Sequence, residues 1–225
     1  MRRESSTVVV LVGEVDEGLL AGLARLPNVS IARAPGDGAP ADRSTSADAA
    51  ATTTAGVGGH AASGLATSGS AARPGWQPGA LALREAARRR TTYVIVPDDP
   101  LADVASRWRT MWSTSAGPAG ADDFEERAAE VLAAWRANRF DLPDYYLVLA
   151  PDQPGGIGPD LYLGPLRAAR PRRVAVVVTN DPLAGAPRVA EELRSLAPGP
   201  WWPPLDELLD TARRFYAGGL AETQG

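Results

Sequence analysis

The sequence predicts a three-layer α/β domain, in which helices cover both faces of a five-stranded, mostly parallel sheet of the flavodoxin-like or Rossmann-like type. Two observations predict this class. Five short apolar runs alternate along the chain with segments of helical periodicity. The 225 residues, 44% of them hydrophobic, suffice for one domain with a sizeable core. Right-handed crossovers between five strands favour the strand order 2-1-3-4-5.

The predicted strands are short runs rich in valine, isoleucine and tyrosine. They cover residues 7–13, 29–34, 91–97, 145–150 and 173–179. The first run, TVVVLVG, has the continuous β-branched character of a strand that is buried on both faces.

Helical spacing of apolar residues predicts the segments between and after the strands. These helices cover 16–26, 80–90, 98–113, 122–140, 158–170, 187–196 and 204–220. Gly164 and Pro165 should disturb the fifth, and Gly218 is a candidate C-cap for the last. The two helices between the third and fourth strands extend the minimal plan.

The whole chain, 1–225, is expected to form a single domain with one flexible insertion at 35–75. This segment is mostly Ala, Gly, Ser, Thr and Pro, with Val57 and Leu65 as its larger aliphatic residues. Such a composition cannot bury enough apolar area to offset the conformational entropy lost on folding.

The absence of some residue types excludes whole classes of chemistry. The chain has no cysteine, all 23 of its basic residues are arginine, and its one histidine, His60, falls in the insertion. A thiol nucleophile, a lysine Schiff base, a phosphate-loop lysine and a histidine-based triad are therefore not expected. A noncatalytic role is the first expectation.

Charge and hydropathy bear on partners and location. A net charge of −4 gives no electrostatic footprint for nucleic acid, and no stretch approaches the roughly 20 apolar residues of a membrane span. The expected location is the cytoplasm of a bacterium, because an Ala-, Arg-, Gly- and Pro-rich chain without lysine is typical of GC-rich bacterial genomes. Neither a nucleic-acid partner nor a membrane is expected, and the sequence does not indicate an oligomeric state.

Charged residues sort by the edge of the predicted sheet. Acids follow the strands, and arginines precede them. The acids are Glu14, Asp16, Glu17, Asp98, Asp99, Asp152 and Asp181, and the arginines are Arg88, Arg89, Arg90, Arg136, Arg139, Arg170, Arg172 and Arg173.

Two interpretations of the acidic edge stay open. Acids at helix N-termini and arginines at C-termini stabilise helices by about 0.3–1 kcal/mol each, and this explains both edges at once. Asp16, and Asp98 or Asp99, are N-cap candidates in this interpretation. The alternative is a Mg²⁺-dependent enzyme acting on a phosphorylated small molecule, with Glu14, Asp98, Asp99 and Asp181 as metal ligands. In the first interpretation no cofactor is expected.

The segment PGPWWPPLDELL at 199–210 contains the four letters that name the chromatin-reading PWWP domains. Those domains are small β-barrels, whereas here the letters lie between two predicted helices, so the context excludes that function. Trp201 and Trp202 point to opposite sides of an extended segment. One should pack under the last helix and the other should be more exposed.

Six tryptophans in one small chain suggest either a packed helical layer or a surface for a partner. The sequence-based hypothesis is a noncatalytic protein-binding or regulatory module that binds another protein through a Trp-rich helical surface. The candidate partner-binding residues are Trp108, Trp112, Trp135, Trp201, Trp202, Phe215 and Tyr216.

Overall fold

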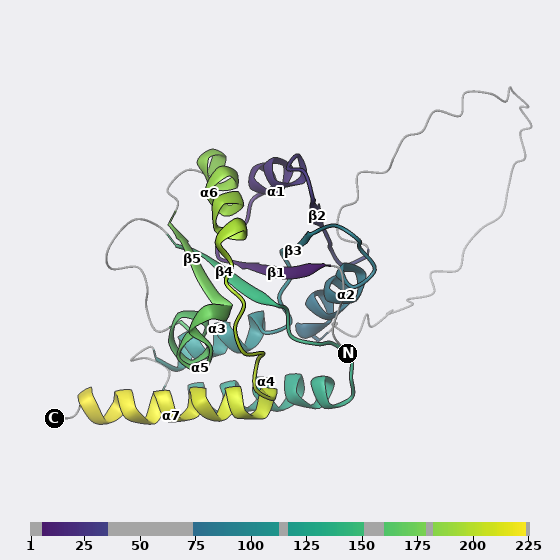
Figure 1. The fold of residues 1–225 in the computed structure, drawn as a ribbon. Helices are drawn as coiled ribbons and strands as arrows, with labels where there is room; N and C mark the ends of the chain where they lie inside the picture. Colours follow the sequence, from purple (N-terminus) through teal and green to yellow (C-terminus); the bar gives the residue numbers. More distant parts are fainter. Residues whose placement is uncertain (1–5, 36–73, 113–116, 151–159, 179–181, 224–225) are drawn as a thin grey trace, which may run out of the picture.

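The computed structural model describes residues 6–35, 74–112, 117–150, 160–178 and 182–223. Five parallel strands form one sheet with helices on both faces, which confirms the predicted fold class (Figure 1). The strands are β1 Thr7–Val12, β2 Val29–Ile31, β3 Tyr93–Val96, β4 Tyr145–Ala150 and β5 Val174–Val178. Nearly all of the proposed insertion, 36–73, lies outside the described residues.

The order of the strands differs from the expected one. The sheet runs β2-β3-β1-β4-β5, so the predicted order 2-1-3-4-5 is wrong and β3 lies between β2 and β1. The different burial of β2 and β3 explains why β3 lies next to β1. In β3 three of the four residues are buried, whereas all three residues of β2 are only half-buried, as suits an edge strand.

One face of the sheet is covered by α1, Glu17–Ala24, and α6, Pro182–Ser195. Leucines of α1 and α6 pack on β1 and β4 side chains that point to this side, such as Val9 and Leu147. Asp16 caps α1 as expected, because its carboxylate accepts a hydrogen bond from the Leu19 N–H at 2.6 Å.

A thicker layer covers the other face. It contains α2 Trp76–Ala86, α3 Ala102–Met111, α4 Gly117–Arg136, the π-helical turn η1 Tyr162–Leu166, the short α5 Arg167–Ala169, the 3₁₀ turn η2 Pro171–Arg173, and α7 Leu205–Thr223. In Figure 1 α4 and α7 lie farthest from the sheet on this side. Trp108 and Phe124 are 1% exposed and form part of its core.

Two helices extend beyond their predicted ends, because the proline and glycine in question do not interrupt them. α2 begins at Trp76 rather than at residue 80, because Pro78 is tolerated in a first turn. It ends at Ala86, which leaves Arg88 in the following turn. α7 continues beyond Gly218 to Thr223, so the predicted C-cap at Gly218 is wrong.

Gly79 on α2 marks the closest approach of that helix to the chain after β3. A Cβ atom at Gly79 would lie 2.2 Å from the Pro100 nitrogen and 2.4 Å from the Asp99 carbonyl carbon. Only glycine allows the two backbones to meet at this distance, and the contact fixes the segment that carries Asp99.

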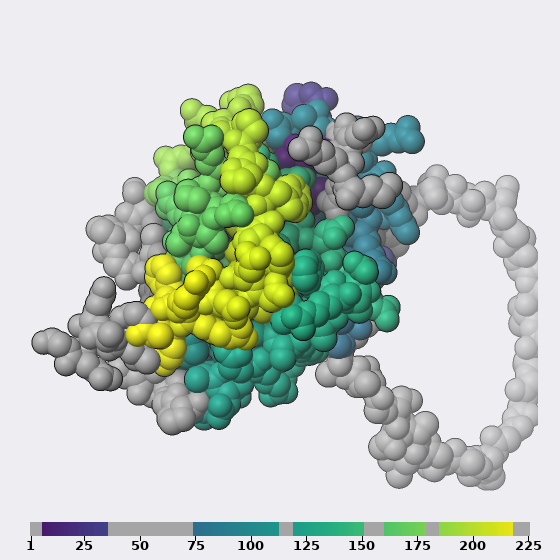
Figure 2. Space-filling view, turned by 60° about the horizontal axis from the view of Figure 1, so that its bottom comes forward, coloured from purple at the N-terminus to yellow at the C-terminus, as the bar shows by residue number. Residues whose placement is uncertain are grey.

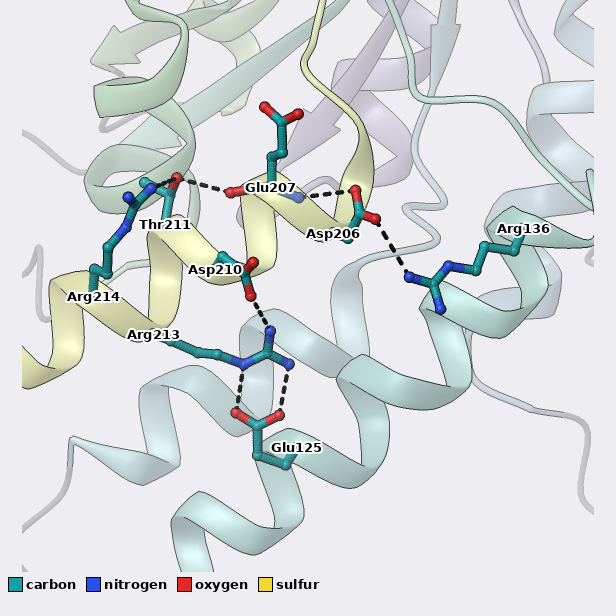
Figure 3. A network of polar contacts seen from close by, with 8 residues as sticks. All are labelled: Glu125, Arg136, Asp206, Glu207, Asp210, Thr211, Arg213 and Arg214. Atoms are coloured by element: carbon teal, nitrogen blue, oxygen red, sulfur yellow. Dashed lines mark hydrogen bonds and ion pairs between the residues drawn. The ribbon is translucent and has the colours of Figure 1, made fainter.

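Ion pairs fasten α7 to α4 (Figure 3). The Arg213 guanidinium donates two hydrogen bonds to the Glu125 carboxylate, at 2.8 and 2.7 Å. Nearer the start of α7, Arg136 donates to Asp206 at 3.3 Å. The bidentate geometry of the first pair is the stronger arrangement.

Within the described part of the chain, no helix is both long enough and apolar enough to cross a lipid bilayer.

Candidate functional site

The structure divides the proposed partner-binding residues by exposure. Trp108 and Trp202 are buried, at 1% and 5% exposed, and Trp112, Trp135 and Tyr216 are half-buried. Trp201 and Phe215 are exposed, at 52% and 46%. As expected, Trp201 and Trp202 differ, with Trp201 on the surface and Trp202 buried.

The tryptophans of α3 pack against other aromatic rings. The Trp108 ring centre lies 5.6 Å from that of Phe124 and 5.9 Å from that of Trp112. The Trp112 ring meets Tyr216 edge to face at 5.1 Å. Both indole N–H groups of this cluster lack a hydrogen-bond partner in the described part of the structure. The cluster therefore joins α3, α4 and α7 by ring packing.

Trp202 anchors the segment that leads into α7. Its indole N–H donates to the Pro143 carbonyl at 2.8 Å, and its ring meets Tyr146 of β4 at 5.7 Å. This tryptophan ties residues 199–204 to the start of β4.

Trp201 faces the other way and lies on a buried arginine. The Arg173 guanidinium is sandwiched between two rings, 4.9 Å from the centre of Trp201 and 4.8 Å from that of Tyr145. Arg173 is 8% exposed. Cation–π contacts of this kind contribute about 0.5–2 kcal/mol each, more when the charge is desolvated.

Hydrogen bonds from arginine fix the backbone of Trp201 and of the two residues before it. Arg173 donates to the carbonyls of Gly199 at 2.8 Å, Pro200 at 3.2 Å and Asp144 at 3.1 Å. Arg170 donates to the carbonyl of Trp201 at 2.7 Å. The exposed indole is thus presented by a backbone that is held at three consecutive residues.

A third arginine completes this region. The aliphatic stem of Arg172 lies against Gly199, where a Cβ atom would come within 3.2 Å of the arginine Cβ. We call Trp201 together with Arg170, Arg172 and Arg173 the Trp201 surface. It lies at the amino end of β5, at the edge where the sequence predicts a concentration of arginine.

Phe215 lies farther along the border between α7 and η1. Its ring contacts Gly164, because a Cβ atom there would lie 3.5 Å from the phenylalanine ring. Figure 2 shows α7 with α4 on one side and the 160–173 segment on the other. Arg170, which donates to the Trp201 carbonyl, follows η1 in the chain, so Trp201 and Phe215 both contact the 160–173 segment.

The opposite edge of the sheet contains a buried carboxyl group. Asp99, which follows β3, is 8% exposed and accepts hydrogen bonds from the hydroxyl groups of Tyr146 and Tyr162. Its third donor is the Leu101 N–H, at 3.1 Å. This last bond is to the N–H of the N-cap residue of α3, and no side chain caps that helix, so the prediction that Asp98 or Asp99 is the N-cap is wrong.

Burial changes the proton affinity of this group. Desolvation raises the pKa of Asp99 to about 6, although the hydrogen bonds from Tyr162, Leu101 and Tyr146 each act to lower it. The pKa values of Tyr146 and Tyr162 lie well above their usual range, because both hydroxyls are buried and face the Asp99 carboxylate. Both tyrosines consequently stay protonated and keep donating at neutral pH.

The four acids of the magnesium hypothesis lie in different settings. Glu14 is exposed, Asp98 accepts a hydrogen bond from the Ala34 N–H at 3.3 Å, and Asp99 points into the interior. Asp181 lies outside the described residues. Among the residues that the structure describes, no three acids or histidines are grouped so as to hold a metal ion. The magnesium site stays a prediction, which calorimetry with Mg²⁺ would test.

Comparison of the chain with family models, with curated proteins and with solved structures finds no match. The candidate site is therefore inferred from the geometry of this chain alone.

Sequence reasoning missed the residues that support both regions. The sequence pattern indicates only that Arg173 is one of several arginines before a strand, yet it is the buried centre of the Trp201 surface. No pattern in the sequence indicates Tyr162. One signal was available, since Tyr145 and Tyr146 stand next to each other at the start of an otherwise aliphatic strand, where a hydroxyl needs a partner.

Proposed function

We propose that this chain is a noncatalytic protein-binding module with a regulatory role, and that its partner binds at Trp201 and Phe215. The observation that carries the proposal is the state of Trp201, which is 52% exposed although its backbone and one ring face are held by arginines. An aromatic side chain that is ordered before binding loses little entropy when a partner covers it.

The composition of the region supports the same function. Tryptophan and arginine are the residues most enriched among those that dominate binding energy at protein interfaces. Phe215 supplies a second exposed ring on the border of α7. The buried tryptophans, Trp108 and Trp202, hold this border in shape and need not touch the partner themselves.

The test is an affinity capture from cells of the natural host, with the full chain as bait. Trp201→Ala and Phe215→Ala are compared with the wild type and with Val178→Ala. Val178 is the matched control, because it is 40% exposed and ends β5 at the opposite edge of the sheet. Each captured protein is then purified and its dissociation constant measured by calorimetry.

The expected partner binds the wild type and the Val178→Ala variant equally, and Trp201→Ala weakens its binding at least about tenfold. Thermal unfolding should show that all the variants remain folded. If every captured protein binds Trp201→Ala and Phe215→Ala as tightly as it binds the wild type, the proposed function is wrong.

A further inference from the structure

We propose that the Trp201 surface recognises an acidic peptide segment, with an apolar side chain of the peptide on the indole and its carboxylates at the arginines. This inference rests on the proposed function and adds the chemical class of the partner. It begins from the pairing of charges in the folded chain.

Of the arginines that the structure describes, eight form ion pairs with carboxylates and eleven do not. Ten ion pairs join arginine to aspartate or glutamate in the described residues, and none of them involves Arg170, Arg172 or Arg173. The molecule has more acids than arginines, 27 against 23. Arg170, Arg172 and Arg173 differ from the other arginines without an ion pair because all three lie around Trp201 and the residues just before it.

The partners that these arginines do have are neutral. Arg173 bonds to three backbone carbonyls and lies between two rings, and Arg170 bonds to the carbonyls of Ala169 and Trp201. Carbonyl groups satisfy the N–H donors of Arg170 and Arg173 but carry no negative charge, and no ion pair of the described residues involves either arginine. The Trp201 surface thus retains a local positive charge on a chain with a net charge of −4. An acidic segment would be attracted to this surface.

Arg172 is the arginine with donors to offer. It is exposed, it makes no hydrogen bond or ion pair within the described residues, and its stem is positioned by Gly199. A guanidinium in this state can bind a carboxylate with two parallel hydrogen bonds. Arg170 and Arg173 would contribute mainly through their charge.

The same residue types also occur where proteins bind single-stranded nucleic acid, by stacking bases on aromatic rings along a basic groove. The Trp201 surface offers one exposed ring, and two of its three arginines already donate to backbone carbonyls. A groove that follows a phosphate backbone needs a series of free basic groups. The geometry points to a peptide.

The experiment is a display selection of random peptides on the full chain, with counter-selection on Trp201→Ala. A synthetic peptide of the selected consensus and a version with Gln and Asn in place of Glu and Asp are then titrated by fluorescence anisotropy. The proteins compared are the wild type, Arg172→Gln and Arg90→Gln. Arg90 is the matched control, an exposed arginine before β3 at the same edge of the sheet.

The proposal expects an acidic consensus and binding that is at least about tenfold weaker for the neutral version. Arg172→Gln should weaken the acidic peptide several-fold and leave the neutral one unchanged, and Arg90→Gln should alter neither. Added salt should weaken binding of the acidic peptide.

The other outcomes separate the two proposals. Peptides that need Trp201 but bind equally well without their acids would retain the proposed function and overturn the acidic partner. A selection that yields no Trp201-dependent peptide would overturn the acidic peptide, while the host capture experiment decides the proposed function separately. Trp201-dependent binding of oligothymidylate that is tighter than that of any peptide would replace the peptide by nucleic acid.

Discussion

The guanidinium of Arg173 lies 4.9 Å from the ring centre of Trp201 and supports the exposed indole from beneath. The same group donates to the carbonyls of the two preceding residues, Gly199 and Pro200. One buried cation therefore fixes both the backbone and one ring face of the most exposed aromatic side chain. The rigidity of the Trp201 side chain should therefore depend on the planar, multiply donating guanidinium of Arg173 as well as on its charge.

Replacing Arg173 by lysine tests this dependence. An ammonium group keeps the charge but cannot span three carbonyls, so the free energy of unfolding should fall by about 1–3 kcal/mol. Urea denaturation measures this loss, and the ¹⁹F resonance of fluorotryptophan at position 201 should report a more mobile ring. The control Arg172→Lys, at an exposed arginine, should cost less than about 0.5 kcal/mol. Equal effects at the two positions would contradict the role given to Arg173.

The buried carboxyl of Asp99 should make stability depend on pH. Its pKa is raised from an ordinary 3.8 to about 6, so the folded state holds this proton more tightly than the unfolded state does. The stabilisation is complete below pH 3.8 and is lost as the pH rises to about 6, a change of up to about 3 kcal/mol. The free energy of unfolding of Asp99→Asn minus that of the wild type should therefore increase by that amount as the pH rises from 3.8 to about 6. Urea denaturation over a pH series measures the difference.

A tyrosine variant supplies the control for this prediction. Tyr162→Phe removes a hydrogen bond that lowers the pKa of Asp99, so the pH window should extend upward. Tyr145→Phe should not move it, because the Tyr145 hydroxyl donates to the Ala197 carbonyl instead. If the difference between Asp99→Asn and the wild type does not change with pH, the buried carboxyl does not titrate as described.

The two kinds of tryptophan should respond differently to the same truncation. Trp202→Phe removes the donor to the Pro143 carbonyl, whereas the indole N–H of Trp112 has no partner to lose in the described structure. Leaving a buried carbonyl without its donor costs about 1–3 kcal/mol beyond the lost packing. Thermal and urea unfolding should therefore show Trp202→Phe to be the more destabilising. Equal losses of stability at the two positions would contradict the contribution given to the Trp202–Pro143 hydrogen bond.

The ion pair between Arg213 and Glu125 should couple α7 to α4 measurably. Its two hydrogen bonds join side chains that are 38% and 49% exposed, so a double-mutant cycle with glutamine at each position should give about 0.5–1 kcal/mol. The coupling should fall at high salt. The pair Arg136–Asp206, with one contact at 3.3 Å, is the comparison and should couple more weakly. Equal coupling energies for the two pairs would show that the bidentate geometry adds no stability.

Local sequence patterns were enough to predict the helices and strands and some of their ends. The run TVVVLV is buried in β1 because continuous β-branched residues suit a strand that is covered on both faces. Asp16 caps α1 because an aspartate just before an apolar helical stripe can reach the first free N–H groups. Both inferences depend on residues that are close together in the chain.

The strand order and the candidate site could not be obtained in that way. β3 rather than β2 borders β1 because of how much apolar surface each strand buries in the assembled sheet, which the crossovers do not specify. From the sequence, Asp99 is a candidate metal ligand or helix cap. In the fold, its oxygens accept hydrogen bonds from Tyr146 and Tyr162, which lie 47 and 63 residues later in the chain.

The α/β class, the five strands and their alternation with helices could be predicted from the amino-acid sequence, as could the lack of cysteine and lysine chemistry. The exposure of Trp201, the burial of Trp202 and the contact of Arg173 with the Trp201 ring became evident only from the folded chain. The physical reason is that periodicity and capping act within one turn or one strand. Burial of a particular side chain is instead set by segments that meet only when the sheet and both helical layers are assembled.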